Sequence, residues 1–174
     1  MGELYQPIVV KMKAKLTYVL LLIAVSGTSQ TKISSGELDL MIGEWTGTLT
    51  YMDYSSNKPF SMPANVTVKQ GKKDTQILLF NEYPNEPQAN SKGKVTISKD
   101  GTTINGNPLV SKENLEDGST QFTTKSTGKD NNEKALIRNI YVIGDNHFII
   151  RKEVKYEDSV EWLQRNEFQY VRNK

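Results

Sequence analysis

The stretch "LMIGEWTGTLTYMDY", residues 40–54, decides the fold class of this chain. From Trp45 to Tyr51, apolar or glycine residues alternate with threonines, which is the two-residue period of a β-strand with one inward and one outward face. A tryptophan directly after Gly43-Glu44, at the start of such a strand, can close one end of a barrel with its large ring. We therefore expect a strand at 44–52 and a structural role for Gly43 and Trp45.

Short, mostly alternating segments separated by turn residues follow to the end of the sequence. Asp-Gly pairs at 100–101 and 117–118 are strong hairpin signals. No helical stretch is long enough to connect parallel strands, so the pattern predicts an antiparallel meander. The predicted strands are 44–52, 62–70, 75–82, 92–99, 102–106, 119–127, 134–144, 146–157 and 159–172.

The predicted fold is all-β: an up-and-down meander that closes into a barrel of eight to ten strands. A sandwich is the alternative architecture for the same strands. The segment "SSGELDLMIG" (34–43) predicts a short helical turn before the barrel, which Ser34 or Ser35 can cap and Gly43 can end. Residues 30–174 contain no repeat, linker or low-complexity tract, so we expect a single domain there.

Residues 1–29 have the order of a secretory signal peptide. Basic "KMKAK" (11–15) precedes apolar "LTYVLLLIAV" (16–25) and small, polar "SGTSQ" (26–30), with cleavage expected near Ser29–Gln30. The apolar run is half the roughly 20 residues that span a bilayer. We expect a secreted or periplasmic protein without stable membrane insertion after cleavage. Residues 1–11, ahead of Met12, fit an artefact of the assigned start.

Charge and cysteine content exclude several classes of function. Without residues 1–29 the chain has 19 basic and 19 acidic side chains, and no lysine or arginine cluster that would bind phosphate backbones. We therefore expect no nucleic-acid partner. The chain has no cysteine, which excludes a thiol nucleophile, thiolate metal ligands and a lipoprotein anchor.

An arginine of the last predicted strand can lie across the indole of Trp45 as a cation–π lid. Arg172 has the side-chain parity for this role, whereas Arg165 lies on the opposite face of the strand and is the weaker candidate. The motif Gly43-Glu44-Trp45, preceded by "ELDLMI" and matched by the late arginine of "RNEFQYVR", resembles the lipocalin-type (calycin) barrel.

The segment "IGEWTGTLTY" is similar to those of small bacterial secreted lipocalin-like proteins. The resemblance implies a barrel around a ligand cavity, closed at one end by Gly43, Trp45 and Arg172. The sequence departs from the family in three features: it has no helix after the last predicted strand, no disulfide, and no helix–turn–helix lid.

Several residues are candidates for the cavity or its mouth. Arg138, Gln164 and Asn166 interrupt otherwise apolar strand faces, and a buried charge is costly unless it is paired, so a ligand carboxylate or carbonyl can account for them. The alternative is that they lie near strand ends and reach water. Tyr51 is on the inward face, and the predicted loop 54–63 carries Tyr54 and Phe60 as a cap or as ordinary loop anchors.

The remaining chemistry favours neither a cofactor nor an enzyme. His147 is the single histidine, and the nitrobindin-like haem barrels of the superfamily need an inward axial histidine. Parity places His147 opposite Phe148 at a strand end, which predicts a solvated turn histidine, no haem and no metal site. "GKDNNE" (128–133) fits a hairpin turn better than a calcium loop. The glutamates of "RKEVKYEDSVE" (151–161), at 153, 157 and 161, fit a solvated face better than an acid–base pair.

We therefore expect an exported, non-catalytic protein that holds a small, largely apolar ligand in its barrel. The alternative is a structural or interaction domain of the cell envelope with a filled core, no ligand and an unspecified protein partner.

Overall fold

The computed structural model describes residues 2 and 31–173. Apart from residue 2, the predicted signal peptide therefore lies outside the described residues. Within 31–173, no helix has the length and apolarity needed to cross a membrane.

One short α-helix precedes a series of antiparallel strands in the described part of the chain. The elements are α1 (Ser35–Asp39), β1 (Gly43–Asp53), β2 (Lys58–Pro63), β3 (Asn65–Gln70), β4 (Gln76–Glu82), the 3-10 turn η1 (Pro87–Ala89), β5 (Ser91–Thr96), β6 (Thr103–Ile104), β7 (Asn107–Asn114), β8 (Thr120–Asp130), β9 (Glu133–Ile143), β10 (His147–Tyr156) and β11 (Leu163–Arg172).

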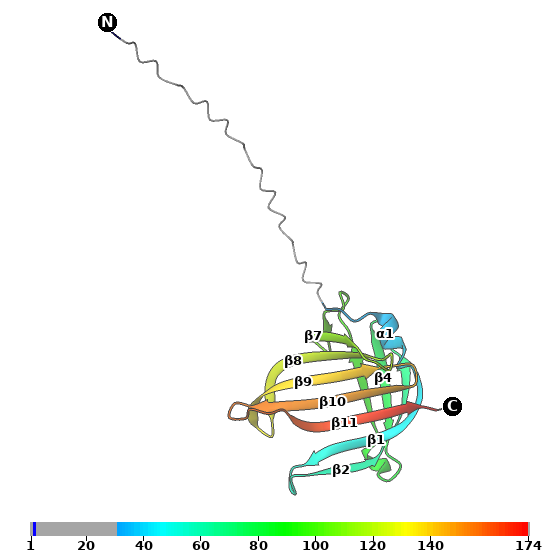
Figure 1. Cartoon of the computed structure of the whole chain (residues 1–174). Coiled ribbons are helices and arrows are strands. Elements are labelled where there is room, and N and C mark those ends of the chain that lie inside the picture. The colour runs from blue at the N-terminus through cyan, green and yellow to red at the C-terminus, as the bar shows by residue number, and fades with distance from the viewer. Residues whose placement is uncertain (1, 3–30, 174) are drawn as a thin grey trace.

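The strands form one antiparallel sheet that curves into a nearly closed barrel (Figure 1). The order is β5-β4-β3-β1-β11-β10-β9-β8-β7-β6, and β2 adds to β1. The two ends of this series meet at an isolated bridge between Ile97 and Ile104, beside a hydrogen bond of 2.7 Å from Asn105 N to Thr96 O. The prediction of an all-β, up-and-down barrel with a short N-terminal helical turn is confirmed.

Two strands differ from the sequence-based prediction. The segment expected as a loop at 54–63 contains β2, which forms a hairpin with β1 from Asp53↔Lys58 to Thr48↔Pro63. The two prolines, Pro59 and Pro63, argue against a strand in the sequence. Proline cannot donate a backbone hydrogen bond, so it is tolerated in a strand only at positions without a ladder partner, as on an edge strand. Strand β7 was also not predicted. Its side chains are only partly buried or exposed, so its sequence lacks the clear alternation of apolar and polar residues.

Helix α1 packs against one end of the barrel, and we call this end the floor. Its N-cap is Ser34, whose side chain accepts a hydrogen bond from the Glu37 N–H while Glu37 accepts from the Ser34 N–H, a capping box. Leu38 and Met41 are fully buried against the barrel interior. The β1–β2, β8–β9 and β10–β11 turns lie at the opposite end, which we call the mouth (Figure 1).

Trp45 fills the floor. Its side chain is 1% exposed, its ring meets Phe148 edge-on at 4.8 Å between centroids, and its indole N–H donates to the carbonyl oxygen of Met41 at 2.8 Å. This pairing satisfies the one polar atom of an otherwise apolar ring. The floor is therefore sealed by an aromatic pair tied to the turn after α1.

Arg172 covers Trp45 from outside. Its guanidinium carbon lies 4.1 Å from the indole centroid, and its nitrogens donate to the backbone carbonyls of Leu40, Ile42 and Asp145. Gly43 has φ +138°, and a Cβ there would stand 2.8 Å from Arg172 Nη1. Glycine is needed at this position both for its backbone conformation and for the room that Arg172 takes.

The lid contact gives a fluorescence prediction. In a Trp162→Phe background, which leaves Trp45 as the reporter, Arg172→Ala is expected to change the emission of Trp45 and to lower the free energy of unfolding by roughly 1–3 kcal/mol, because it removes a cation–π contact and three hydrogen bonds. Arg165→Ala in the same background is the control and should leave the emission unchanged. Identical emission from the Arg172→Ala variant and its parent would contradict the lid.

Candidate functional site

A β-bulge between β10 and β11 shapes the inner wall near the mouth. Phe168 faces Ile150 and Asn166 faces Lys152, but the next pair is Gln164 with Glu153, so Arg165 is an additional residue on β11. A bulge re-aims side chains relative to an uninterrupted strand. The parity used to place Arg165 and Gln164 from sequence fails at this point.

The barrel interior contains a cavity of about 160 Å³ between the floor and the mouth. The interior cavity is partly open to solvent, and the residues that bound it are mostly aromatic or aliphatic, together with two asparagines, one glycine and one lysine. Its lining is Leu79, Asn81, Gly93, Lys94, Val95, Asn105, Tyr141, Ile150, Phe168 and Tyr170.

Tyr170, whose ring borders this cavity, has an unusual hydroxyl. Tyr170 is 2% exposed, and its ring packs between Phe148 (4.7 Å) and Phe168 (5.9 Å). Among the described residues, its hydroxyl is the one sealed side-chain polar atom without a hydrogen-bond partner. Burial, with a smaller contribution from nearby Tyr83, raises the pKa of Tyr170 far above its usual range, so the hydroxyl is a neutral donor.

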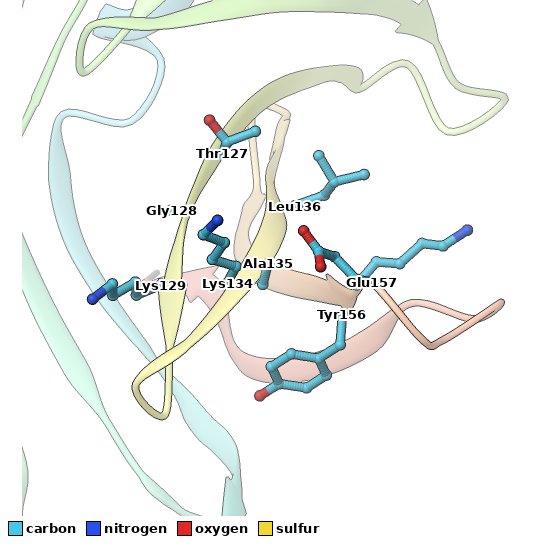
Figure 2. Close-up of a pocket in the computed structure, with 9 residues that line it drawn as sticks. Thr127, Gly128, Lys129, Lys134, Ala135, Leu136, Tyr156 and Glu157 are labelled. Carbon is cyan, nitrogen blue, oxygen red and sulfur yellow. The ribbon is translucent and has the colours of Figure 1, made fainter.

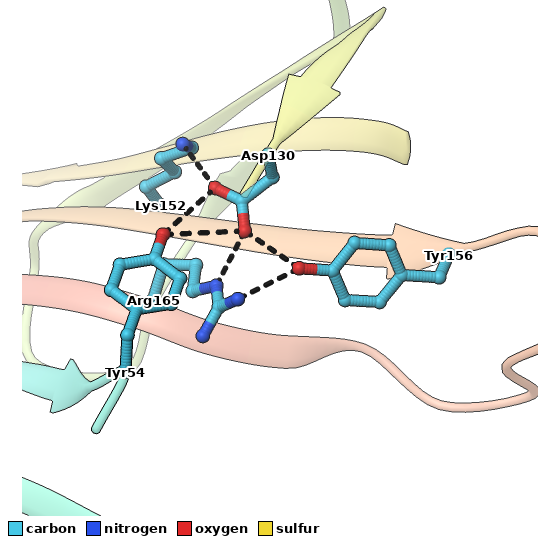
Figure 3. Close-up of polar contacts among 5 residues, drawn as sticks. All are labelled: Tyr54, Asp130, Lys152, Tyr156 and Arg165. Atoms are coloured by element: carbon cyan, nitrogen blue, oxygen red, sulfur yellow. Dashed lines mark hydrogen bonds and ion pairs between the residues drawn. The ribbon is translucent and has the colours of Figure 1, made fainter. Parts of the chain in front are cut away.

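A polar network occupies the mouth, where sequence reasoning had placed none (Figure 3). The Asp130 carboxylate accepts from Arg165 Nε at 2.6 Å, from Lys152 Nζ at 2.8 Å and from the Tyr156 hydroxyl at 2.8 Å. The Tyr54 hydroxyl approaches it at 3.4 Å, and the Arg165 guanidinium carbon lies 4.2 Å from the Tyr54 ring centroid. We call these five residues the mouth network.

The β8–β9 hairpin explains why Asp130 points into the mouth. Asn131 and Asn132 both have positive φ, 48° and 66°, which is the backbone of a tight two-residue hairpin turn. Asp130 pairs with Glu133 across this turn and has the same parity as Phe122, which is fully buried in the core. The "GKDNNE" segment is therefore a hairpin, as expected, and its one aspartate belongs to the interior.

Asp130 is strongly held in its ionised form. Burial raises its pKa, but hydrogen bonds from Lys152, Tyr156 and Arg165 outweigh burial and lower the pKa to about 2. The carboxylate side chain is 2% exposed. Near neutral pH it is a fixed negative charge that positions two cations.

Next to the mouth network lies a hollow of about 450 Å³, the mouth pocket. Three of the residues predicted for a cavity or mouth line it: Tyr51, Tyr54 and Asn166. Phe60 packs beside Tyr51 at 5.5 Å between centroids, is 48% exposed and does not line the hollow. The full lining is Tyr51, Met52, Asp53, Tyr54, Ser55, Lys152, Arg165 and Asn166.

Arg138 and Gln164 do not lie in the interior, which corrects their predicted place in the cavity. Arg138 stacks on Trp162 at 4.3 Å and forms an ion pair with Glu153 on the outer face of the barrel. Glu153 also approaches Arg151, at 3.6 Å. Gln164 pairs with Glu153 across the bulge and lines neither the interior cavity nor the mouth pocket. Paired charges on an outer sheet face explain why an arginine interrupts an apolar strand.

His147 lies at the start of β10, opposite Val171, whose side chain is exposed. Its side chain is 33% exposed, and Nε2 is 3.5 Å from a carboxylate oxygen of Asp117. The next residue, Phe148, is the one that points into the core. Within residues 31–173 no group of three or more histidine, cysteine, aspartate or glutamate side chains is arranged to hold a metal ion.

A larger hollow of about 580 Å³ lies over the ends of β8, β9 and β10 (Figure 2). Lys129, Lys134 and Lys155 line it together with Leu136, whose side chain is half-exposed. Tyr156 is turned away from Leu136 and its hydroxyl is engaged with Asp130. The hollow therefore offers surface lysines rather than a polar group that is held in place by partners, and it is the weaker site.

No protein-family model matches the chain, and no curated protein sequence matches it. Among solved structures, Rv2717c from M. tuberculosis is similar with a TM-score of 0.46 and 10% identity, over 83% of this chain and 100% of that one. A protein of unknown function from the DUF3598 family of Nostoc punctiforme PCC 73102 is similar with a TM-score of 0.38 and 9% identity, over 85% of this chain and 53% of that one. These similarities carry no information about ligand or activity.

Asp130→Asn tests the electrostatics of the mouth network. At pH 7 the substitution is expected to lower the free energy of unfolding by roughly 3 kcal/mol, because it leaves the buried Arg165 without its counter-charge. The folded-state pKa of Asp130 lies below its unfolded value near 3.8, so the folded chain binds fewer protons and the ionised carboxylate stabilises it above pH 4.

That contribution, about 2 kcal/mol, is lost as the pH falls from about 4 to about 2. Urea unfolding of the parent and of Asp130→Asn at several pH values between 7 and 2.5 should therefore show a difference in stability that narrows in acid. A difference that stays constant down to pH 2.5 would show that Asp130 is not held ionised by the network.

Proposed function

We propose that this chain is an exported, non-catalytic binding protein that holds a small, largely apolar molecule in the interior cavity of its barrel. The observation that carries the proposal is the interior cavity itself, a hollow of about 160 Å³ whose lining is mostly aromatic and aliphatic. A molecule that fills this hollow removes apolar surface from water on both sides, which favours binding.

The size of the cavity limits the ligand. Its volume of about 160 Å³ is close to that of an engineered apolar cavity, about 150 Å³, that binds benzene. A single ring with one polar substituent fits this space. Haem or a long acyl chain needs a pocket several times larger.

The walls of the cavity favour a mostly apolar ligand with a few polar contacts. Ile150 and Phe168 face each other on β10 and β11, and Leu79 lies on the opposite wall. Asn105 is held in place because its side-chain oxygen accepts from Thr96 N at 2.9 Å. Apolar walls with few fixed polar groups are the usual composition of small-molecule sites.

The proposal includes two further points, the absence of catalysis and the export of the protein, and one argument supports each. Asp53, which lines the mouth pocket, and Asp130 beside it each have a pKa of about 2, which makes both weak general bases near neutral pH. The case for export rests on the sequence of residues 11–30, with its basic, apolar and small-residue order.

A second candidate function is a structural or interaction domain of the cell envelope. Its supporting observation is that aromatic and aliphatic side chains, including Trp45, Phe122 and Phe148, fill the barrel near the floor. The two candidates differ in one property, which is whether the interior cavity accepts a molecule from solution.

Phenol and toluene form a matched pair of probes for the cavity. We expect both to bind the purified protein in ligand-observed NMR titrations, because each can place one ring against Leu79, Ile150 and Phe168. Tyr170→Phe removes a hydroxyl that is sealed away from the cavity space, so it should leave the affinities for phenol and toluene nearly unchanged.

Leu79→Phe is the cavity-filling control and should abolish binding of both probes while leaving the circular dichroism spectrum unchanged. Native mass spectrometry of the protein from its own cells would show a retained molecule of similar size. Failure of phenol and toluene to bind, together with a bare mass in the native spectrum, would favour the structural domain.

A further inference from the structure

The mouth pocket contains cationic side chains with N–H groups that have no hydrogen-bond partner among the described residues. Arg165 is 8% exposed and has two of its three nitrogens engaged, Nε with Asp130 and Nη2 with the Tyr156 hydroxyl. We propose that this pocket binds the carboxylate of a small amphipathic acid whose apolar part lies in the interior cavity. The inference rests on the proposed function and names the class of its ligand.

Arg165 Nη1 is the central donor. It has no hydrogen-bond partner among the described residues, and it is not among their sealed polar atoms, which comprise only the Tyr170 hydroxyl. Nη1 therefore reaches open space, and the hollow that Arg165 lines is the mouth pocket. The stacking of its guanidinium on Tyr54 and the two bonds from Nε and Nη2 fix its orientation before any ligand arrives.

Lys152 and Asn166 add donors beside Arg165. The two residues face each other across β10 and β11. Lys152 Nζ gives one hydrogen bond to Asp130, which leaves two of its three N–H groups, and the side-chain amide of Asn166 has no partner among the described residues. Charge-assisted bonds from an arginine and a lysine are the usual means of holding a carboxylate.

Local hydrogen-bond donors, and not net charge, favour an anion in the mouth pocket. Lys152 and Arg165 supply two positive charges, and Asp130 offsets one of them. Asp53 also lines the pocket and offsets the other, while hydrogen bonds from Ser55 and Ser56 hold its carboxylate in its own turn. An anion would therefore be held by the unused N–H groups of Arg165 and Lys152.

The interior cavity and the mouth pocket are neighbours along the barrel. The facing pair Ile150 and Phe168 lines the first, and the next inward pair, Lys152 and Asn166, lines the second. Positions two residues apart on a strand are roughly 6.6 Å apart. A molecule with one ring and a carboxylate on a two-carbon arm matches this spacing.

The test uses 3-phenylpropionate and its neutral counterpart 3-phenylpropan-1-ol in isothermal titrations. We expect the acid to bind at least tenfold more tightly than the alcohol, and we expect added salt to weaken the acid alone. Lys152→Met and Arg165→Gln should each reduce the affinity for the acid roughly tenfold and leave that for the alcohol nearly unchanged.

Lys155→Met is the matched control, because Lys155 is on the same strand as Lys152 and lines the hollow over the ends of β8, β9 and β10 rather than the mouth pocket. It should leave the affinity for the acid unchanged. Arg165→Lys keeps the positive charge and should retain part of the affinity for the acid. It replaces Arg165→Gln in the test if circular dichroism shows that Arg165→Gln does not fold.

The two proposals fail in different ways. Equal affinity for acid and alcohol, or no binding of either while phenol binds, would overturn the carboxylate site and leave the interior cavity intact. Absence of binding for phenol as well would overturn the proposed function together with this inference. A loss of acid affinity in Lys155→Met equal to that in Lys152→Met would show only general surface electrostatics and would also overturn the site.

Discussion

The stacking of Arg172 on Trp45 is the contact on which the barrel depends. It joins the end of β11 to the start of β1, the two strands whose pairing brings the ends of the described chain together. Arg172 also donates hydrogen bonds to backbone carbonyls before β1 and before β10. Its side chain therefore links the turn after the helix, the floor and the barrel wall. A filled floor gives the barrel one closed end, so a hollow inside the barrel opens toward the mouth or through the wall.

Much of the fold could be predicted from the period of the sequence. The stretch from Trp45 to Tyr51 alternates cleanly, and Asp-Gly pairs mark hairpins, so strand direction and order follow from local signals. Strand β2 could not be predicted in this way, because Pro59 and Pro63 are acceptable only when the position on an edge is known. Edge position is a property of the whole sheet.

The site was less predictable than the fold. Tyr51, Tyr54 and Asn166 were found by parity or by loop position, but a single additional residue in β11 reversed the assignments of Arg165 and Gln164. No local signal in "LQRNEFQYV" marks the bulge. Asp130 was visible only as part of a turn, since its role depends on cations from β10 and β11 that lie far away in the sequence.

The seam of the barrel has a consequence for exchange with solvent. Long ladders join most neighbouring strands, whereas β5 and β6 meet through the Ile97–Ile104 bridge and a few adjoining bonds around Asn105. Local opening follows the path that breaks the fewest interactions. The interior cavity has both Val95 and Asn105 in its wall, one from each side of this seam. The seam is therefore a part of the cavity wall that few ladder interactions hold, whereas long ladders join most of the other strands.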